Sequence, residues 1–176
     1  MERKEIAANE FTCKPLEILS NQWMLLACGD FEKKEFNSMV VGWGAFGTMW
    51  RKPFCMIVVR PSRYTYDFVE KYDNFSLAVF PDEFKKKLGA LGSKSGRELD
   101  KINDSGFTPI ASSAVSSPGF DEAELILECK KMYQEDFDPS KFLCDNIDSS
   151  CYPDGDYHRM YFGEILAISG TDKYRV

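Results

Sequence analysis

Positively charged side chains gather in one stretch of this sequence, residues 38–66, which contains no Asp or Glu. Four positive charges there leave −10 on the rest of a 176-residue chain whose formal net charge is −6. Guanidinium and ammonium groups bind phosphates and carboxylates through charge-assisted hydrogen bonds, so the stretch is suited to an anionic ligand. The pattern also fits a buried, strand-rich core with cations at its ends. The four cations are Arg51, Lys52, Arg60 and Arg63.

A glycine-rich segment lies within the same stretch. Residues 42–47 spell Gly-Trp-Gly-Ala-Phe-Gly and match the pattern G-x-G-x-x-G. A dinucleotide-binding fingerprint needs a helix that opens at the third glycine, whereas residues 48–53 lead into a further strand, so we exclude that type of site. Glycines still let a ligand approach the backbone closely, and Trp43 between two of them is able to cover a flat ring. A tight bend or bulge in a barrel strand accounts for the glycines equally well.

His158 is the only histidine in the chain. A multi-histidine metal centre is therefore excluded, and a hydrolase triad of the Ser-His-Asp or Cys-His type would have to use this one ring. The six cysteines form no C-x-x-C pair, the spacing that zinc sites and redox dithiols usually show. We expect no metal site and reduced, mostly buried thiols. The cysteines stand at positions 13, 28, 55, 129, 144 and 151.

Composition and length indicate one globular domain that spans residues 1–176. Apolar residues make up 44% of the chain and charged ones 28%, which excludes the disordered, collagen-like and coiled-coil classes. The longest apolar run, residues 54–59, is far too short to span a membrane. The negative net charge argues against a nucleic-acid partner, and the N-terminal residues lack the apolar core of a secretory signal. We expect a soluble, cytoplasmic protein with no membrane partner.

The elements that position these groups are predicted to be mostly strands. Alternating or β-branched apolar residues predict the strands, and Pro61 with Ser62 predicts a helix start at which Ser62 is the N-cap. Gly106 is placed to end a polar helix that runs through residue 102. Six or so strands with a few short helices suggest an antiparallel barrel with helical insertions. The predicted strands are residues 16–28, 37–46, 54–60, 74–80, 120–133 and 158–169, and the other helices are residues 63–70 and 82–88.

Four segments of the chain carry a resemblance to a known family. Residues 37–44, Asn-Ser-Met-Val-Val-Gly-Trp-Gly, resemble the N-T-M-x-x-x-W segment of the flavin reductase-like, FMN-binding split-barrel family, and of its flavoredoxin branch in particular. Residues 60–66 (RPSRYTY), 92–97 (GSKSGR) and 158–164 (HRMYFGE) resemble further motifs of that family in the same order. Four motifs in order are more specific than any one of them, and the likeness covers nearly the whole chain.

The resemblance implies a mainly β fold, a Greek-key antiparallel FMN-binding split barrel with α insertions. It also implies a homodimer that binds FMN noncovalently near the subunit interface. The activity it implies is that of an NAD(P)H:flavin oxidoreductase, by NAD(P)H-dependent flavin reduction or by electron transfer through bound FMN. The alternative is a non-enzymatic, flavodoxin-like electron carrier or flavin-binding module with a redox partner protein. A pyridoxamine-phosphate oxidase-like enzyme on the same barrel is a third interpretation, for which the sequence shows no motif.

The resemblance and the residue chemistry assign two groups of residues to the flavin. The phosphate-binding group stands at a strand end and at the opening of a short helix, where free N–H groups and the helix dipole favour anions. Residues 37–43 supply hydrogen bonds and an apolar face to the isoalloxazine ring, with Ser38 where the family carries Thr. Lys94 supplies a second cation to the phosphate or to the N1–O2 edge of the ring, where a positive charge raises the flavin potential. The expected flavin-binding residues are Asn37, Ser38, Met39, Val40, Val41, Gly42, Trp43, Arg60, Ser62, Arg63, Thr65, Ser93, Lys94 and Ser95.

His158 is the expected catalytic residue, because a histidine in this region of the family lies near the flavin and could orient a nicotinamide or a substrate. The alternative is a hydrogen-bonded structural histidine at the start of a strand. Hydride transfer between two stacked rings needs orientation rather than a side-chain acid or base. The lack of a catalytic constellation therefore fits a flavin mechanism.

Overall fold

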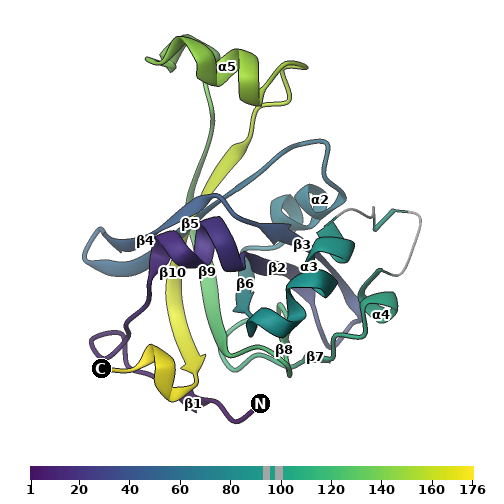
Figure 1. Ribbon diagram of the computed structural model, residues 1–176, viewed down its shortest axis with the longest axis vertical. Helices are drawn as coiled ribbons and strands as arrows, with labels where there is room; N and C mark the ends of the chain where they lie inside the picture. The colour runs from purple at the N-terminus through teal and green to yellow at the C-terminus, as the bar shows by residue number, and fades with distance from the viewer. Residues whose placement is uncertain (93–95, 98–100) are drawn as a thin grey trace.

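A computed structural model describes residues 1–92, 96–97 and 101–176 (Figure 1). Its centre is an antiparallel sheet in which the longer strands follow the spatial order β3-β2-β6-β9-β10-β5-β4, and the short β1 pairs with β10. The mainly β, antiparallel fold class is therefore confirmed. The strands are β1 (Lys4–Glu5), β2 (Met24–Asp30), β3 (Glu35–Val41), β4 (Gly44–Met49), β5 (Lys52–Val59), β6 (Asn74–Val79), β9 (Leu125–Asp136) and β10 (Arg159–Gly170), with a separate pair β7 (Pro109–Ile110) and β8 (Gly119–Phe120).

The two edges of the sheet, β3 and β4, are consecutive in the chain. Because β3 pairs with β2 and β4 pairs with β5, the sheet stays open between its edges. The chain crosses from one edge to the other through Gly42 and Trp43. The prediction of one strand over residues 37–46 is therefore wrong, since a single strand cannot lie at both edges of the sheet. The break occurs where glycines make a sharp bend possible.

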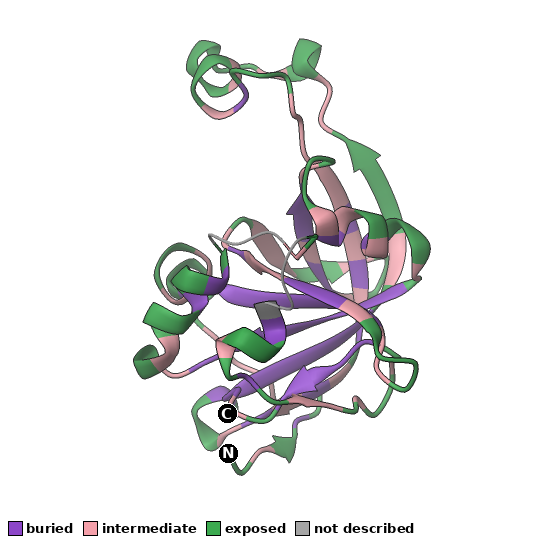
Figure 2. Cartoon of the chain, turned by 90° about the vertical axis from the view of Figure 1, so that its right-hand side faces the viewer, coloured by how far each residue is buried: buried purple, intermediate pink, exposed green. Residues whose placement is uncertain are grey.

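Both faces of the sheet are covered, so β2 and β6 are runs of mostly buried residues instead of alternating ones (Figure 2). In β2, Met24 and Leu26 pack in one apolar cluster, whereas Leu25 packs in a second. Successive side chains of a strand point to opposite faces, which separates the two clusters. The first cluster includes buried residues of β5, β6, β9 and β10. The second includes buried residues of α3 (Lys85–Gly92) and α4 (Lys101–Ser105).

The strand expected over residues 16–28 begins only at Met24. The preceding residues form a helix, α1 (Pro15–Glu17), which continues as one π-helical turn (Ile18–Gln22). Pro15 occupies the first helical position, where the missing N–H removes no hydrogen bond. Trp23 ends the turn with a positive φ of 64°. The apolar residues here follow a helix with one buried side chain, Ile18, which is why a strand was the wrong prediction.

The helix after β5 is α2 (Tyr64–Lys71), close to its predicted bounds. Its N-cap residue is Arg63, and no side chain caps it. Ser62, the predicted N-cap, donates its hydroxyl hydrogen bond to the Asp156 carboxylate at 2.5 Å instead. The N-cap prediction is therefore wrong, because the helix begins one residue later, with Arg63 at the N-cap position.

The other short helices modify the predicted pattern only at their ends. A 3-10 turn (Asp82–Phe84) precedes α3, and Gly106, with φ of 69°, follows α4 as predicted. The strand expected over residues 120–133 divides into β8 and β9, and a last 3-10 turn (Asp172–Tyr174) follows β10. In the part of the chain that the structure describes, no helix is long and apolar enough to cross a membrane.

Between β9 and β10 the chain makes a long excursion, residues 137–158, which we call the arm. The arm projects away from the sheet and carries α5 (Asp145–Cys151) at its far end (Figure 1), after a 3-10 turn (Pro139–Lys141). Most of its residues are exposed or half-buried. At its base, the Phe137 N–H donates to the His158 carbonyl oxygen at 3.0 Å. The two ends of the arm are thus tied together where they meet the sheet.

All six cysteines carry free thiols. Burial raises the pKa of the Cys28 thiol to about 12, so this thiol stays protonated and unreactive at neutral pH. The expectation of mostly buried thiols holds for half of them. Cys28, Cys55 and Cys129 are buried, Cys13 and Cys151 are half-buried, and Cys144 is exposed.

Candidate functional site

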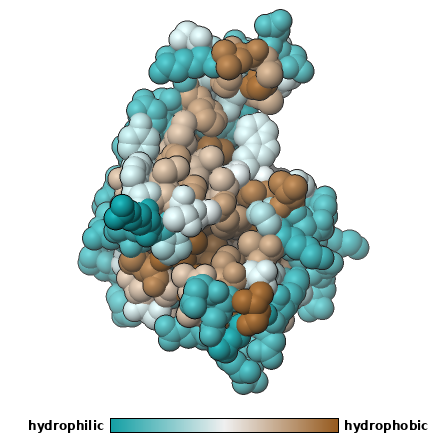
Figure 3. Space-filling view, turned by 90° about the vertical axis from the view of Figure 1, so that its left-hand side faces the viewer, coloured by the Kyte–Doolittle hydropathy of each residue, from teal (hydrophilic) through white to brown (hydrophobic). Residues whose placement is uncertain are grey.

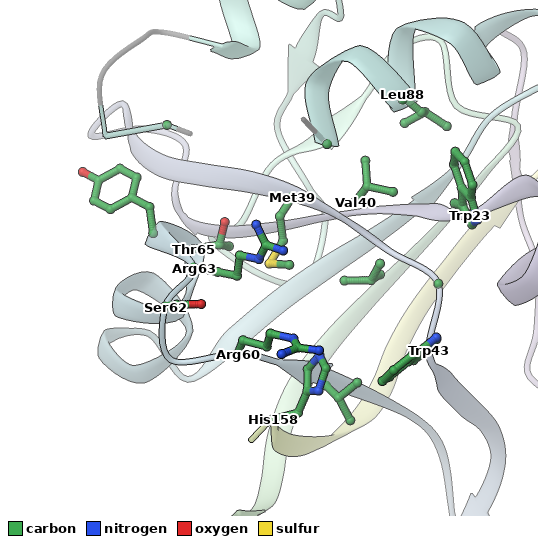
Figure 4. Close-up of a pocket in the computed structure, with 17 residues that line it drawn as sticks. Trp23, Met39, Val40, Trp43, Arg60, Ser62, Arg63, Thr65, Leu88 and His158 are labelled. Carbon is green, nitrogen blue, oxygen red and sulfur yellow. The ribbon is translucent and has the colours of Figure 1, made fainter. Parts of the chain in front are cut away.

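A cleft of about 660 Å³ opens beside the corner between β3 and β4. Its walls come from β3, from the end of β5, from the first turn of α2, from α3 and from the residue before β10 (Figure 4). This volume lies within the range of small-molecule sites. Ten of the predicted site residues line the cleft: Met39, Val40, Val41, Gly42, Trp43, Arg60, Ser62, Arg63, Thr65 and His158.

One end of the cleft is cationic and polar, with Ser62, Arg63 and Thr65 side by side (Figure 4). Arg63 is exposed, and its guanidinium makes no hydrogen bond or ion pair with any residue that the structure describes. The first turn of α2 lacks a side-chain cap, and uncapped N–H groups at a helix start attract anions. This end of the cleft is therefore able to receive a phosphate.

Arg60 lines the cleft but also holds the arm. Its guanidinium donates to the carbonyl oxygens of Cys151, at 2.7 Å, and Asp156, at 3.3 Å. The same guanidinium lies 5.0 Å from the centre of the Tyr152 ring, in a cation–π contact. Two of its nitrogens are thus engaged by the protein, and Arg63 is the freer of the two arginines. Binding of a phosphate by Arg60 stays a prediction.

Asn37 and Ser38 do not line the cleft, although both are predicted to bind the ring. Asn37 is buried, and its Nδ2 donates to Thr65 Oγ1 at 2.8 Å, which ties β3 to the start of α2. Ser38 is fully buried, and its Oγ lacks a hydrogen-bond partner among the described residues. Asn37 therefore positions Thr65, while a flavin contact by either residue stays a prediction.

The predicted loop residues Ser93, Lys94 and Ser95 lie outside the described residues. The glycines on each side of them, Gly92 and Gly96, line the cleft. A Cβ on Gly96 would lie 2.6 Å from the Asn37 side-chain oxygen, so Gly96 itself packs closely against β3. The two ends of the predicted loop thus belong to the cleft.

The other end of the cleft is aromatic and apolar, with Trp23, Trp43 and Leu88 around it (Figure 4). Trp43 is 50% exposed, so an indole face is open to a ligand. A Cβ on Gly42 would lie 3.1 Å from Trp23 Cδ1, and a Cβ on Gly44 would lie 2.3 Å from the Met56 carbonyl oxygen. The glycines therefore permit close packing at a bend, the alternative that the sequence had left open, and Gly42 also borders the cleft.

Several residues that sequence reasoning missed complete the cleft. Tyr64 stands inside the segment RPSRYTY and had a signal in that motif. Trp23 and Leu88 had none, because Trp23 reaches the cleft from the end of the π-helical turn and Leu88 reaches it from α3, which packs against β3. The missed residues are Trp23, Val58, Tyr64, Leu88 and Gly89.

His158 lies at the edge of the cleft, half-buried, with its ring centre 5.2 Å from that of Trp43. Its Nδ1 and the Tyr152 hydroxyl oxygen are 2.9 Å apart. Burial, followed by the positive charges of Arg60 and Arg63 against the opposing charge of Asp156, lowers the pKa of His158 to about 4. The ring is therefore neutral at pH 7 and does not serve as a general acid, although one of its nitrogens still carries a proton.

Comparison with known proteins decides the family. The family model of the flavin reductase like domain matches residues 19–174. The chain belongs to this family.

In residues 1–92, 96–97 and 101–176, no group of three or more His, Cys, Asp or Glu side chains is placed to hold a metal ion.

Solved structures share the fold of this flavin reductase-like chain. Flavoredoxin from Methanosarcina acetivorans is 24% identical, with a TM-score of 0.68 over 100% of this chain and 79% of that one. An NADH:FAD oxidoreductase from Streptomyces globisporus is 13% identical, with a TM-score of 0.64 over 88% and 78%. An uncharacterized protein of Pyrococcus abyssi is 26% identical over 118 residues, which are 66% of this chain and 57% of that protein. The chain thus spans less than two thirds of that relative's length. The likeness to the solved structures confirms the split-barrel fold.

Proposed function

We propose that this flavin reductase-like chain, acting as one domain over residues 1–176, binds FMN in the cleft and catalyses NAD(P)H-dependent reduction of flavin. The division of the cleft carries the proposal. Arg63 and uncapped helix N–H groups lie at one end, and Trp23 and Trp43 lie at the other. A phosphorylated ring ligand needs that division, because a dianion seeks charged donors and a flat ring seeks aromatic and apolar surface.

Unpartnered groups of the protein support this ligand. The guanidinium of Arg63 is unpaired among the described residues, and it stands beside the Thr65 hydroxyl, which Asn37 holds in place. A charged donor next to an anchored hydroxyl and a helix start is a suitable set for a phosphate. The buried, unpaired hydroxyl of Ser38 is a further polar group on β3 that lacks a described partner.

Bound FMN would supply the two-electron chemistry, and the protein would supply binding and orientation. Trp43 offers the face on which a ring packs, and His158 borders the same space. Because His158 is neutral at pH 7, the residues that line the cleft contribute orientation and not an acid. Stacking in a defined geometry accounts for rate enhancement without a catalytic side chain.

A non-enzymatic electron carrier is the second candidate. It is supported by the likeness to a flavoredoxin over the whole of this chain, whereas the likeness to an NADH:FAD oxidoreductase supports the enzyme. A carrier would take electrons from a redox partner protein and would not need a nicotinamide. The cleft suits both functions, since both require the same bound flavin.

One assay separates the two candidates. The protein is loaded with FMN, freed of excess flavin and kept without oxygen while its yellow colour is followed. Bleaching by NADH or NADPH supports the enzyme, and bleaching only by dithionite or by a reduced partner protein supports the carrier. A preparation that stays colourless after soaking in excess FMN would contradict both.

We also propose that the chain forms a homodimer through an aromatic patch in which Trp50 and Tyr133 are exposed, Phe162 is half-buried and Phe54 is buried beneath them. The Phe54 and Phe162 rings stack with centres 5.4 Å apart, and Trp50 lies 6.1 Å from both Tyr133 and Phe162. Trp50 is 57% exposed and Tyr133 is 44% exposed. Large exposed apolar patches mark interaction sites, and Figure 3 shows apolar side chains along the middle of one face and again on the arm above it.

Sedimentation tests the homodimer. Trp50→Asn removes the indole from the patch, and Asn tolerates the φ of 51° found at this turn. We expect this variant to shift a dimer towards monomer. Leu16→Asn, which removes an exposed apolar side chain outside the patch, is the control and leaves the mass unchanged. A monomeric wild-type protein would contradict the proposal.

A further inference from the structure

Tyr152 and His158 are paired at the base of the arm in a way that leaves one nitrogen of the imidazole free. The Tyr152 hydroxyl oxygen and His158 Nδ1 are 2.9 Å apart. Among the described residues, neither the hydroxyl nor Nε2 of His158 makes a further hydrogen bond. Because His158 lines the cleft, Nε2 is the nitrogen left for a ligand.

The position of the proton in this pair follows from burial. Tyr152 is buried, with 4% of its surface exposed, and the only described hydrogen-bond partner of its hydroxyl is Nδ1. If Nδ1–H donated to the hydroxyl oxygen, the hydroxyl proton would have no acceptor in a buried place, which destabilises a fold. If the hydroxyl donates to Nδ1, the neutral ring carries its proton on Nε2, and this ring lines the cleft. The second arrangement satisfies the hydroxyl and Nδ1 and leaves Nε2–H for a ligand.

Tyr152 is held in place from several sides. Its ring stacks on Phe142, with centres 5.8 Å apart and planes at 17°, and lies 4.9 Å from the Tyr157 ring. The Arg60 guanidinium covers it at 5.0 Å. Its own N–H donates to the Asp148 carbonyl oxygen at 2.8 Å at the end of α5. A ring restrained in this way keeps its hydroxyl directed at one acceptor.

We infer that Tyr152 is a positioning residue that holds His158 in the neutral Nε2–H tautomer, so that the cleft presents an uncharged N–H donor beside Trp43. The ligand group that fits such a donor is a carbonyl oxygen on a flat ring, as in the carboxamide of a nicotinamide. The assignment of this ligand rests on the proposed function, whereas the tautomer rests on the protein alone.

The charges around His158 agree with an uncharged ring. Arg60 at the end of β5 and Arg63 at the start of α2 oppose protonation, and Asp156 on the arm favours it. Burial adds to the effect of the arginines, and the pKa of His158 falls to about 4. The remaining ring neighbours, Trp43 and Phe137, are uncharged.

The single histidine makes the tautomer directly measurable. Protein labelled with ¹⁵N in both imidazole nitrogens is examined by NMR between pH 5 and pH 8. We expect a protonated Nε2 and an unprotonated Nδ1 over this range in the wild type. We expect Tyr152→Phe to give a mixture of the two tautomers. Tyr157→Phe removes a hydroxyl of the same arm that donates to Asp148 and, as the matched control, keeps the wild-type pattern.

Two outcomes would overturn the tautomer assignment: an Nδ1–H tautomer in the wild type, or a Tyr152→Phe variant with an unchanged spectrum. The ligand assignment is tested by adding nicotinamide to the FMN-loaded protein. We expect a saturable shift of the Nε2–H resonance and at least about threefold weaker binding in Tyr152→Phe. No shift in a protein with the expected tautomer would overturn the ligand alone. Failure to bind FMN would overturn the proposed function and leave the tautomer result standing.

Discussion

Replacing Arg63 by Ala removes the guanidinium that we assign to the phosphate of FMN. Arg63 is exposed and unpaired among the described residues, so the substitution is expected to change the free energy of unfolding by less than about 0.5 kcal/mol. A hydrogen bond to a charged group contributes about 1.5–3 kcal/mol. We therefore expect the dissociation constant of FMN to rise about 10- to 150-fold.

The measurement is a titration of flavin fluorescence at fixed ionic strength, made with FMN and with riboflavin. Riboflavin has the same ring but no phosphate, so its affinity for Arg63→Ala is expected to match that for the wild type. The affinity of the wild type for FMN is expected to fall with salt more steeply than that of the variant, because salt screens a charge pair. The ratio of the two flavin affinities thus isolates the phosphate contact from the ring contacts.

Arg51→Asn is the matched control. It removes a cation from the same acid-free stretch, at the β4–β5 turn outside the cleft lining, and Asn tolerates the φ of 63° found there. We expect both flavin affinities to stay unchanged in this variant. An unchanged FMN affinity in Arg63→Ala, or an equal loss for riboflavin, would refute the assignment of Arg63 to the phosphate.

Three further predictions concern the cleft and the corner beside it. Asp156→Asn is expected to bind FMN more tightly, because it removes a carboxylate that accepts from Ser62 at the phosphate end; weaker binding in the same titration would argue against it. The pKa of His158 is about 4 in the folded chain, against about 6.5 when unfolded. As the pH falls, the unfolded chain therefore takes up a proton at a higher pH than the folded chain does. The free energy of unfolding is thus expected to decrease as the pH falls from 6.5 to 4. Urea unfolding of His158→Gln should show a shallower loss over that range, whereas parallel curves would contradict the shift. Gly44→Ala is expected to lower the melting temperature strongly, because its Cβ would lie 2.3 Å from the Met56 carbonyl oxygen; a wild-type melting curve would show that β4 and β5 separate easily.

The segment RPSRYTY shows what sequence patterns can predict about this site. A proline after an apolar run ends a strand and favours a turn, and the spacing of Tyr64 and Phe68 indicates a helix face. Local rules therefore placed Arg63 and Thr65 at a strand end and a helix start, as the structure has them. The partner of the Ser62 hydroxyl could not be predicted in the same way, because its acceptor, Asp156, lies on the arm 94 positions away.

Residues 16–22 show the opposite case. Their apolar composition favours a strand, but a helix of this length gains its stability from the surface on which it packs. Ile18 packs in the first apolar cluster, and Trp23 lines the cleft at a positive φ. Neither contact leaves a signal in the local sequence.

The sequence by itself determined the mainly β fold class, the acid-free stretch and the family, because these depend on local propensity, charge and motif order. The tertiary structure alone decided which cation is free and which is engaged. Arg60 donates to carbonyl oxygens of the arm, 91 and 96 positions away, while Arg63, three residues further on, has no described partner. Backbone carbonyls are the same in every residue, so only the folded path of the chain determines which of them meet a given arginine.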